Sequence, residues 1–254
     1  QGSVWFSSSF LELTPSVEGT DLIIDEAMTN ITFQYNASAA SGSGSGSSTS
    51  SSLTAQNIAG GRYHTCAIVD DGKVACWGDN FEGQLGDGTT TDRSTPTLTD
   101  SLGTGRTAVQ VATGDYFTCV LLDNDEVKCW GDNQYGQLGD GTTTDRTSPP
   151  SSGITFPTGR TPVALAAGDH QACAIMDDGS LTCWGSNGLG QIGDGTTTNR
   201  NSPTVVSLSS GDTVIKVGSG DSHSCALLDS GSIKCWGSQR FGQLGDGTTS
   251  HSGI

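Results

Sequence analysis

The stretch "CWGDNFEGQLGDGTTTDR", residues 76–93, decides the fold because close copies of it return three times. The copies begin at Cys129, Cys183 and Cys235. Glycines interrupt its polar residues, and no apolar residue recurs with the helical period of 3.6, so the stretch predicts turns and not a helix. A phrase of turns that recurs at a regular distance indicates a repeat architecture.

The whole unit repeats, and its period is 53, 54 and 52 residues when it is measured between Gly61, Gly114, Gly168 and Gly220. Periods of this size, rich in short strands and glycine, are typical of β-propellers and β-solenoids. Each unit starts with an apolar or alternating run such as residues 108–114, and two more short strands surround a tight turn. We therefore predict an all-β, propeller-type array with about four short antiparallel strands per repeat. The expected repeats are residues 53–106, 107–160, 161–212 and 213–254, the last without its final strand.

The residues before the array have a different composition. Ile31, Phe33 and Tyr35 alternate with polar residues, which predicts a strand in an N-terminal β segment over residues 1–40. Such a segment would end a preceding β domain, cover the first repeat, or donate a strand that closes the array. Residues 41–52 are serine, glycine and threonine and predict a flexible linker. Residues 1–3 fit the remnant of a purification tag, or else Gln1 is a mature terminus.

All eight cysteines fall into pairs within predicted hairpins. In "CAIVDDGKVAC", Asp70, Asp71 and Gly72 fit a type I turn that ends in a left-handed glycine. This register places Cys66 opposite Cys76 in a non-hydrogen-bonded pair, where the Cα atoms approach to about 4.5 Å and a disulfide fits. The same register pairs Cys119 with Cys129, Cys173 with Cys183, and Cys225 with Cys235. In the second repeat Asp125 replaces the turn glycine, and we expect some backbone strain there.

Two other interpretations of the cysteines stay open beside disulfides. Zinc sites prefer short Cys-x-x-Cys pairs that converge from two places, whereas each pair here lies within one hairpin. Reduced thiols buried as small hydrophobic side chains are the second alternative. One-to-one pairing in every unit favours disulfides, and disulfides predict an extracellular or cell-surface location. The sequons at Asn30 and Asn36 are compatible with secretion.

The unit from Gly61 to Thr89 resembles the repeat of the regulator of chromosome condensation family, and the resemblance extends over residues 53–249. Members of that family fold as β-propellers, usually of seven blades. They serve as nucleotide-exchange factors, as a plant ultraviolet photoreceptor and as secreted inhibitors of β-lactamases. The resemblance thus implies a propeller, here of a secreted, disulfide-containing branch, but it implies no single function, because one fold serves unrelated tasks. Four repeats do not account for a closed ring of seven.

Charge and motifs exclude several function classes. With 27 acidic and 11 basic residues the net charge is −16, which argues against nucleic acid as a partner. No apolar run approaches the roughly 20 residues that insert into a bilayer. The recurrent aspartates, such as Asp87, have equivalent surroundings, whereas paired catalytic carboxylates need different ones. They also lack the closing glutamate of a calcium loop. We expect no enzymatic activity, no cofactor and no metal.

Binding residues are expected where the repeats differ, since blade geometry fixes the other positions. One such position lies two residues after the glycine from which the period is measured, and another precedes Gly-Gln-Leu. The candidate binding residues are Tyr63, Tyr116, His170, Tyr135, Leu189 and Phe241, with Phe81 and Arg240 beside them. Exposed aromatic residues and arginine are typical of interfaces with a protein or glycan partner. Alternatively, the aromatic side chains cover the core between blades.

A second function class stays open as well. An incomplete array exposes unpaired strand edges, so the chain is alternatively a structural subunit of an extracellular assembly. Self-association would then proceed by stacking or by exchange of strands between incomplete propellers.

Overall fold

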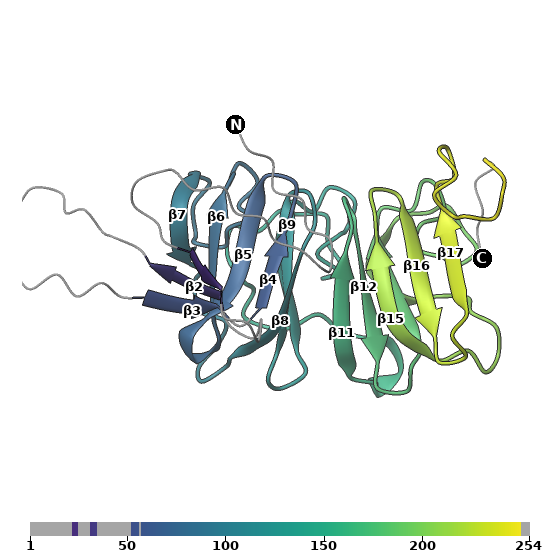
Figure 1. Ribbon diagram of the computed structural model, residues 1–254, viewed down its shortest axis with the longest axis horizontal. Helices are drawn as coiled ribbons and strands as arrows, with labels where there is room; N and C mark the ends of the chain where they lie inside the picture. Colours follow the sequence, from purple (N-terminus) through teal and green to yellow (C-terminus); the bar gives the residue numbers. More distant parts are fainter. Residues whose placement is uncertain (1–21, 25–30, 35–51, 56, 250–254) are drawn as a thin grey trace, which may run out of the picture. The chain divides into compact units, whose positions relative to one another are not determined.

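The computed structural model describes residues 22–24, 31–34, 52–55 and 57–249, and it divides the chain into two compact units, residues 1–54 and 55–254. In the first unit, β1 (Leu22–Ile24), β2 (Ile31–Gln34) and β3 (Ser52–Ala55) form a sheet in the order β1-β2-β3 (Figure 1). The strand predicted at Ile31 and Phe33 is therefore present. The predicted tag remnant lies outside the described residues, and so does the predicted linker apart from Ser52.

The second unit contains four antiparallel sheets, here called blades 1 to 4 in chain order (Figure 1). Blade 1 contains β4 (Asn57–Gly60), β5 (His64–Val69), β6 (Lys73–Gly78) and β7 (Arg93–Leu98). Blade 2 contains β8 (Ala108–Thr113), β9 (Phe117–Leu122) and β10 (Val127–Gly131). Blade 3 contains β11 (Pro162–Ala167), β12 (Gln171–Met176), β13 (Leu181–Gly185) and β14 (Arg200–Val205). Blade 4 contains β15 (Val214–Ser219), β16 (His223–Leu228) and β17 (Ile233–Gly237).

Helix is scarce in the described residues. The 3-10 turns η1 (Asp70–Gly72) and η2 (Pro157–Gly159) have three residues each. In the described part of the chain, no helix has the length and apolar character needed to cross a membrane.

The second and third strands of each blade form the predicted hairpin. In blade 1, Val69 faces Lys73 and Cys66 faces Cys76, as the turn arithmetic requires. All four predicted cysteine pairs are disulfides, each with a Cα–Cα distance of 4.1 Å. That separation agrees with the closely spaced, non-hydrogen-bonded pairs of an antiparallel ladder. The disulfide prediction is confirmed.

The hairpin tips depart from the prediction in one blade. Gly179 and Gly231 have φ values of 77° and 82°, as expected for the left-handed end of a type I turn. In blade 1, however, Asp71 also has a left-handed φ of 61°, immediately before Gly72 at 71°. Aspartate tolerates this region because its short polar side chain bonds locally. Asp125, which replaces the glycine in blade 2, adopts it as well, with φ 64°.

The number of strands per blade is three or four. Blades 1 and 3 have the expected four strands, whereas blades 2 and 4 have three. In blade 2 the fourth strand is reduced to one bridge between Gly131 and Arg146. Pro149 and Pro150 follow that bridge, and proline has no N–H to donate to a ladder. A second contact follows, in which the Ile154 N–H donates a hydrogen bond of 2.9 Å to the Val127 carbonyl, and sheets of three to four strands agree with the prediction of about four strands per repeat.

The hydrophobic core lies between successive blades. Three clusters join blade 1 to 2, blade 2 to 3 and blade 3 to 4. The innermost strands β4, β8, β11 and β15 contact one another in sequence. As predicted, Leu85, Leu138 and Ile192 are fully buried between blades. Their equivalent in blade 4, Leu244, is only half-buried.

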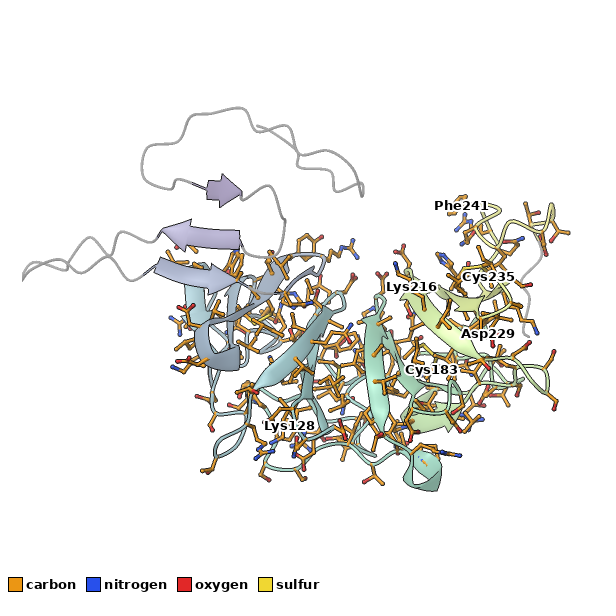
Figure 2. The ribbon with its side chains drawn as sticks, turned by 60° about the horizontal axis from the view of Figure 1, so that its bottom comes forward. Lys128, Cys183, Lys216, Asp229, Cys235 and Phe241 are labelled. Atoms are coloured by element: carbon orange, nitrogen blue, oxygen red, sulfur yellow. A yellow bond between two sulfur atoms is a disulfide. The ribbon has the colours of Figure 1, made fainter. Side chains whose placement is uncertain are left out.

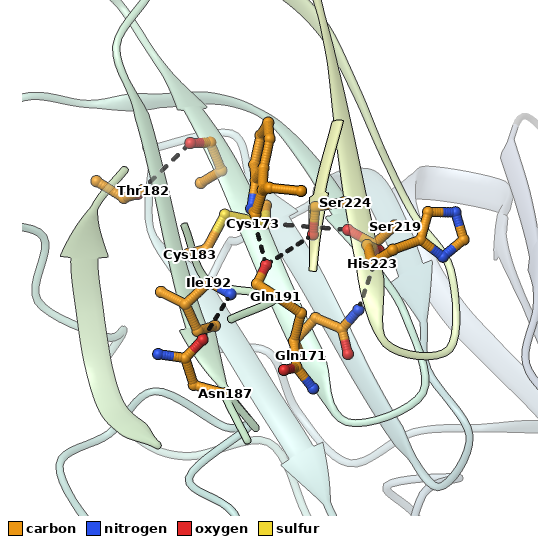
Figure 3. The surroundings of a disulfide bond; sticks show 12 residues. Gln171, Cys173, Thr182, Cys183, Asn187, Gln191, Ile192, Ser219, His223 and Ser224 are labelled. Carbon is orange, nitrogen blue, oxygen red and sulfur yellow. Dashed lines mark hydrogen bonds between the residues drawn. A yellow bond between two sulfur atoms is a disulfide. The ribbon is translucent and has the colours of Figure 1, made fainter. Parts of the chain in front are cut away.

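A hydrogen bond from each tryptophan reinforces this packing. The indole nitrogens of Trp130, Trp184 and Trp236 each donate to a backbone carbonyl of the preceding blade, at 3.0, 2.9 and 3.0 Å. In the last case the acceptor, Gln191, also accepts a hydrogen bond of 3.0 Å from Ser224 (Figure 3). Buried carbonyl groups are costly without such donors, so each of these three tryptophans fixes the position of its blade against the preceding one.

Candidate interaction face

The repeated Gly-rich phrase is scaffold, because its polar side chains bind its own backbone. The Asn80 amide accepts a hydrogen bond of 2.9 Å from the Leu85 N–H and donates to the carbonyl oxygens of Thr89 and Thr91, each at 3.1 Å. Asn133 and Asn187 bond the equivalent loops in the same way. A fully buried amide with these partners organises the loop from within.

The recurrent aspartates are held by neighbouring donors. Asp87 accepts hydrogen bonds from the Thr89 hydroxyl at 2.7 Å and from Arg93 Nε at 2.7 Å. Burial alone would raise the pKa of Asp87, but these hydrogen bonds and the guanidinium hold its pKa below the usual value. Asp140 with Arg146, and Asp194 with Arg200, repeat the arrangement. These carboxylates are therefore engaged in ion pairs that shape the turn.

The two predicted variable positions lie at the same end of every blade. The carbonyl oxygen of Tyr63 accepts a hydrogen bond of 3.0 Å from the Asp79 N–H, which joins the turn before β5 to the loop after β6. The same bond recurs between Asp132 and Tyr116, Ser186 and His170, and Ser238 and Ser222. We call this end the variable-loop face. It comprises the turns 61–64, 114–117, 168–171 and 220–223 and the loops 79–84, 132–137, 186–191 and 238–243.

Aromatic side chains on this face meet across blade borders. The rings of Tyr63 and Tyr116, from blades 1 and 2, have centroids 5.9 Å apart, and those of Tyr135 and His170, from blades 2 and 3, are 5.1 Å apart. Tyr63 is 54% exposed. Within the described residues, none of these four side chains belongs to the clusters between blades. The structure therefore disfavours the interpretation in which these aromatic side chains cover the core.

The other predicted residues occupy the same loops but not these ring pairs. Phe81 is 74% exposed, Phe241, which is labelled in Figure 2, is 84% exposed, and Leu189 is also exposed. The Arg240 guanidinium lies 5.4 Å from the centre of the Phe241 ring, a cation–π distance. The structure thus places all eight predicted residues in the loops of one face, and it brings four of them into two contacting pairs.

Beside the aromatic pairs lies a cavity of about 480 Å³ that the sequence analysis missed. It is lined by one turn from each blade, and its lining includes Arg62, Asp115, Asp169 and Asp221. These four residues occupy one repeat position, immediately before the predicted variable one. A position that contains one arginine and three aspartates was the signal available in the sequence.

Around the cavity, carboxyl groups outnumber cationic side chains. Arg62 Nη1 lies 3.0 Å from Asp115 Oδ2. Burial, followed by the neighbouring Asp115 and Asp221 carboxyls, raises the pKa of Asp169 to about 7. Burial and nearby carboxylates, the first of them Asp132, also raise the pKa of Glu82 on the same face. A face with this potential attracts cations and repels anionic partners.

Comparison with known proteins identifies the repeat. A model described as the regulator of chromosome condensation (RCC1) repeat matches residues 71–121, 124–175 and 178–227. A second model of the repeat matches residues 55–84, 108–137, 163–191 and 214–243. The chain belongs to the RCC1 repeat family. The family resemblance inferred from the sequence is confirmed, and blades 1 to 4 are RCC1 repeats.

Relatives with RCC1 repeats include much larger proteins. The chain is 31% identical over 204 residues to the human E3 ubiquitin-protein ligase HERC2, a match that covers 79% of this chain and 4% of HERC2. It is 32% identical over 192 residues to the ultraviolet-B receptor UVR8 of Arabidopsis thaliana, which covers 75% of this chain and 43% of UVR8. The chain therefore spans less than half the length of each of these relatives.

Solved structures confirm the fold. Human WBSCR16 superposes with a TM-score of 0.72 at 22% identity, over 93% of this chain and 64% of WBSCR16. Prp20p of Saccharomyces cerevisiae superposes with a TM-score of 0.68 at 23% identity, over 82% of this chain and 51% of Prp20p. At such identities the likeness concerns the β-propeller fold alone.

Proposed function

We propose that this chain is a non-enzymatic module that binds another protein outside the cell through the variable-loop face. The observation that carries the proposal is the pair of aromatic contacts, Tyr63 with Tyr116 and Tyr135 with His170, which lie at blade borders and outside the core. Aromatic side chains that packing does not require, set on a rigid scaffold, are typical of the energetic centres of interfaces.

Relatives of known structure support a protein as the partner. Prp20p has been described with its binding to Gsp1p and histones, and yeast RCC1 has been solved with Kap60 bound. These interactions belong to those proteins and identify no partner of this chain. They favour a protein over a glycan, which stays an outcome of the experiment below.

The location and the lack of enzymatic activity have separate support. Four disulfides within the described residues suit an oxidising compartment, because cytosolic reductants keep thiols reduced. Asp87, Asp140 and Asp194 are each paired with an arginine in equivalent environments, and equivalent carboxylates do not divide into an acid and a base.

Alanine substitution of Tyr63, Tyr116 and Tyr135 tests the proposed face. Cross-linking mass spectrometry of the secreted fraction identifies the proteins bound to the unsubstituted chain and to the variant. We expect the variant to lose those proteins while its melting temperature changes by less than about 3 °C, the effect of roughly 1 kcal/mol. The matched control replaces Val163 and Ile215, which are exposed on β11 and β15, and should keep the partner.

Two results would contradict the proposed face. A large fall in melting temperature would assign the tyrosines to the core, and unchanged recovery of the partner would place the interface elsewhere. A glycan array read with the same variants separates the classes of ligand. Binding to a glycan that disappears with the tyrosines would replace the protein partner.

Self-association is a second candidate function, and the exposed side of blade 4 favours it. Ile233 is 69% exposed, and Leu244 is half-buried where its equivalents in other blades are fully buried. Sedimentation velocity at dilute and at high concentration distinguishes the candidates. A mass that rises with concentration favours assembly, and a constant monomer mass excludes it.

A further inference from the structure

The cavity on the variable-loop face has charge that the described residues do not neutralise. Arg62 pairs with Asp115 at 3.0 Å. Asp169 and Asp221 also line the cavity, and no lysine, arginine or histidine in the described part of the chain forms an ion pair with them. Carboxylates that face one another without a counter-ion repel, and a bound cation relieves that repulsion.

The molecule itself shows which kind of cation suits the cavity. At the repeat position that contains aspartate in blades 2, 3 and 4, blade 1 contains Arg62. The guanidinium of Arg62 stands at one of the four equivalent positions and donates a hydrogen bond to Asp115 of the next blade. Guanidinium groups match carboxylates because their planar N–H groups fit two oxygens at once. The remaining two aspartates present the same chemistry to a group from outside.

Two further observations discriminate between ligands. Among the described residues, no three histidine, cysteine or acidic side chains are arranged to hold a metal ion, which disfavours a divalent cation. Thr113 lines the cavity, is more than nine-tenths buried, and its Oγ1 has no hydrogen-bond partner. A buried hydroxyl without a partner is costly, and an N–H donor inserted into the cavity would satisfy it. Both observations favour an organic cation with several N–H groups.

We propose that the cavity binds the guanidinium of an arginine side chain, with Asp169 and Asp221 as its carboxylate partners and Thr113 as an acceptor. This inference rests on the proposed function, because the arginine belongs to the protein that docks on the variable-loop face. The cavity volume of about 480 Å³ exceeds what one arginine side chain fills, so backbone of the partner enters with it.

The charged neighbours of Asp169 determine how binding depends on pH. Burial, and after it Asp115 and Asp221, raise the pKa of Asp169 to about 7, while Arg62 opposes the shift. Because protonated Asp169 has lost its charge, the affinity for a guanidinium falls as the pH is lowered through 7. An exposed carboxylate with an ordinary pKa would keep its affinity down to about pH 4.

The experiment uses the unmodified chain and N-acetyl-arginine amide as the probe, with binding followed by NMR titration. The variant D169N/D221N should bind the probe at least about fivefold more weakly, since two charge-assisted hydrogen bonds are lost. The control D71N/D229N removes the same charge from exposed hairpin tips and should bind within about twofold of the unmodified chain. N-acetyl-citrulline amide, which has the same shape without the charge, should not bind.

A second variant, R62Q, tests the same site independently if D169N/D221N does not fold. R62Q releases Asp115 from its ion pair, so the probe should bind about threefold more tightly or better. Weaker binding by R62Q, equal binding of the citrulline analogue, or an equal loss in D71N/D229N would each overturn the proposal. Calcium or magnesium that displaces the probe at micromolar concentration would overturn it in favour of a metal site.

The outcomes of the two experiments are distinguishable. If the probe does not bind but the tyrosine variants lose the partner, the face is right and the cavity ligand is wrong. If the probe binds but the tyrosine variants keep the partner, the cavity stands and the docking face does not.

Discussion

The indole Nε1 of Trp184 in blade 3 donates a hydrogen bond of 2.9 Å to the backbone carbonyl of Gln137 in blade 2. Trp184 is fully buried, and Phe156 packs edge-on against its ring with centroids 5.8 Å apart. One side chain thus combines apolar packing with an N–H donor that satisfies a buried carbonyl.

Replacing Trp184 by phenylalanine tests that combination. The variant should lose about 2 to 4 kcal/mol of unfolding free energy, because it leaves a cavity and a buried carbonyl without its donor. Urea denaturation followed by circular dichroism measures the loss. V163A, at an exposed position, should change the free energy by less than about 0.5 kcal/mol. A loss for W184F no larger than that of V163A would show that the hydrogen bond and the packing contribute little.

The disulfides give a prediction for mass and stability. Intact mass without reductant should be lower than that of the all-thiol chain by eight hydrogens, because all eight cysteines are paired. Replacing Cys119 and Cys129 by alanine should cost about 2 to 3 kcal/mol in the chain-entropy model. Eight titratable thiols in freshly purified protein would contradict the pairing and remove the support for an oxidising compartment.

Two glycines allow the stability cost of a steric clash to be separated from the cost of a left-handed backbone conformation. Gly139 has φ +71°, and a Cβ added there would lie 2.7 Å from Trp184 Nε1. Gly211 has φ +94°, and an added Cβ would meet nothing within 4 Å. G211A should therefore cost about 1 kcal/mol for the left-handed conformation alone, whereas G139A should cost about 1 to 3 kcal/mol more. Thermal melts measure both, and equal costs would show that Trp184 moves freely.

His64 predicts a dependence of stability on pH. It is buried, its Nε2 lies 2.9 Å from Thr118 Oγ1, and burial lowers its pKa to about 4 although Asp115 opposes the shift. Between pH 6.5 and 4 the unfolded chain binds a proton that the folded chain does not bind. The neutral, buried His64 therefore contributes up to about 3 kcal/mol to the free energy of unfolding. This contribution is fully present above pH 6.5 and is lost as the pH falls to 4.

Substitution of His64 by glutamine, the residue found at the equivalent position 171, isolates this term. The difference in unfolding free energy between the unmodified chain and H64Q should diminish as the pH falls from 7 to 4. Asp169, whose raised pKa acts in the opposite direction, is present in both chains and cancels. A difference that does not vary with pH would show that His64 becomes protonated without cost in the folded chain.

The hairpins were predictable from the sequence because two local rules agree there. Period-two alternation and the Asp-Asp-Gly turn both place Cys66 opposite Cys76, and four copies of the pattern removed chance as an explanation. The face was predictable for a similar reason, since equivalent positions in a propeller lie at the same end of each blade. The left-handed Asp71 was not, because turn propensity does not separate two adjacent residues that both tolerate that region.

The cavity was not predictable because it depends on how four turns converge. In the sequence, Arg62 stands at a repeat position where the other three repeats have aspartate. In the structure Arg62 of blade 1 forms an ion pair with Asp115 of blade 2.

The disulfides also determine how the array responds to tension, because none of them links one blade to another. Each closes a sequence separation of 10 residues inside a single hairpin. A chain stretched between its ends can therefore unfold blade by blade with every covalent bond intact. The residues enclosed by each disulfide do not add to the length of the stretched chain. Reduction of one disulfide then releases roughly 30 Å of additional chain length per blade. In an oxidising environment the disulfides therefore limit the maximum extension of the chain, and the redox state of its surroundings determines that limit.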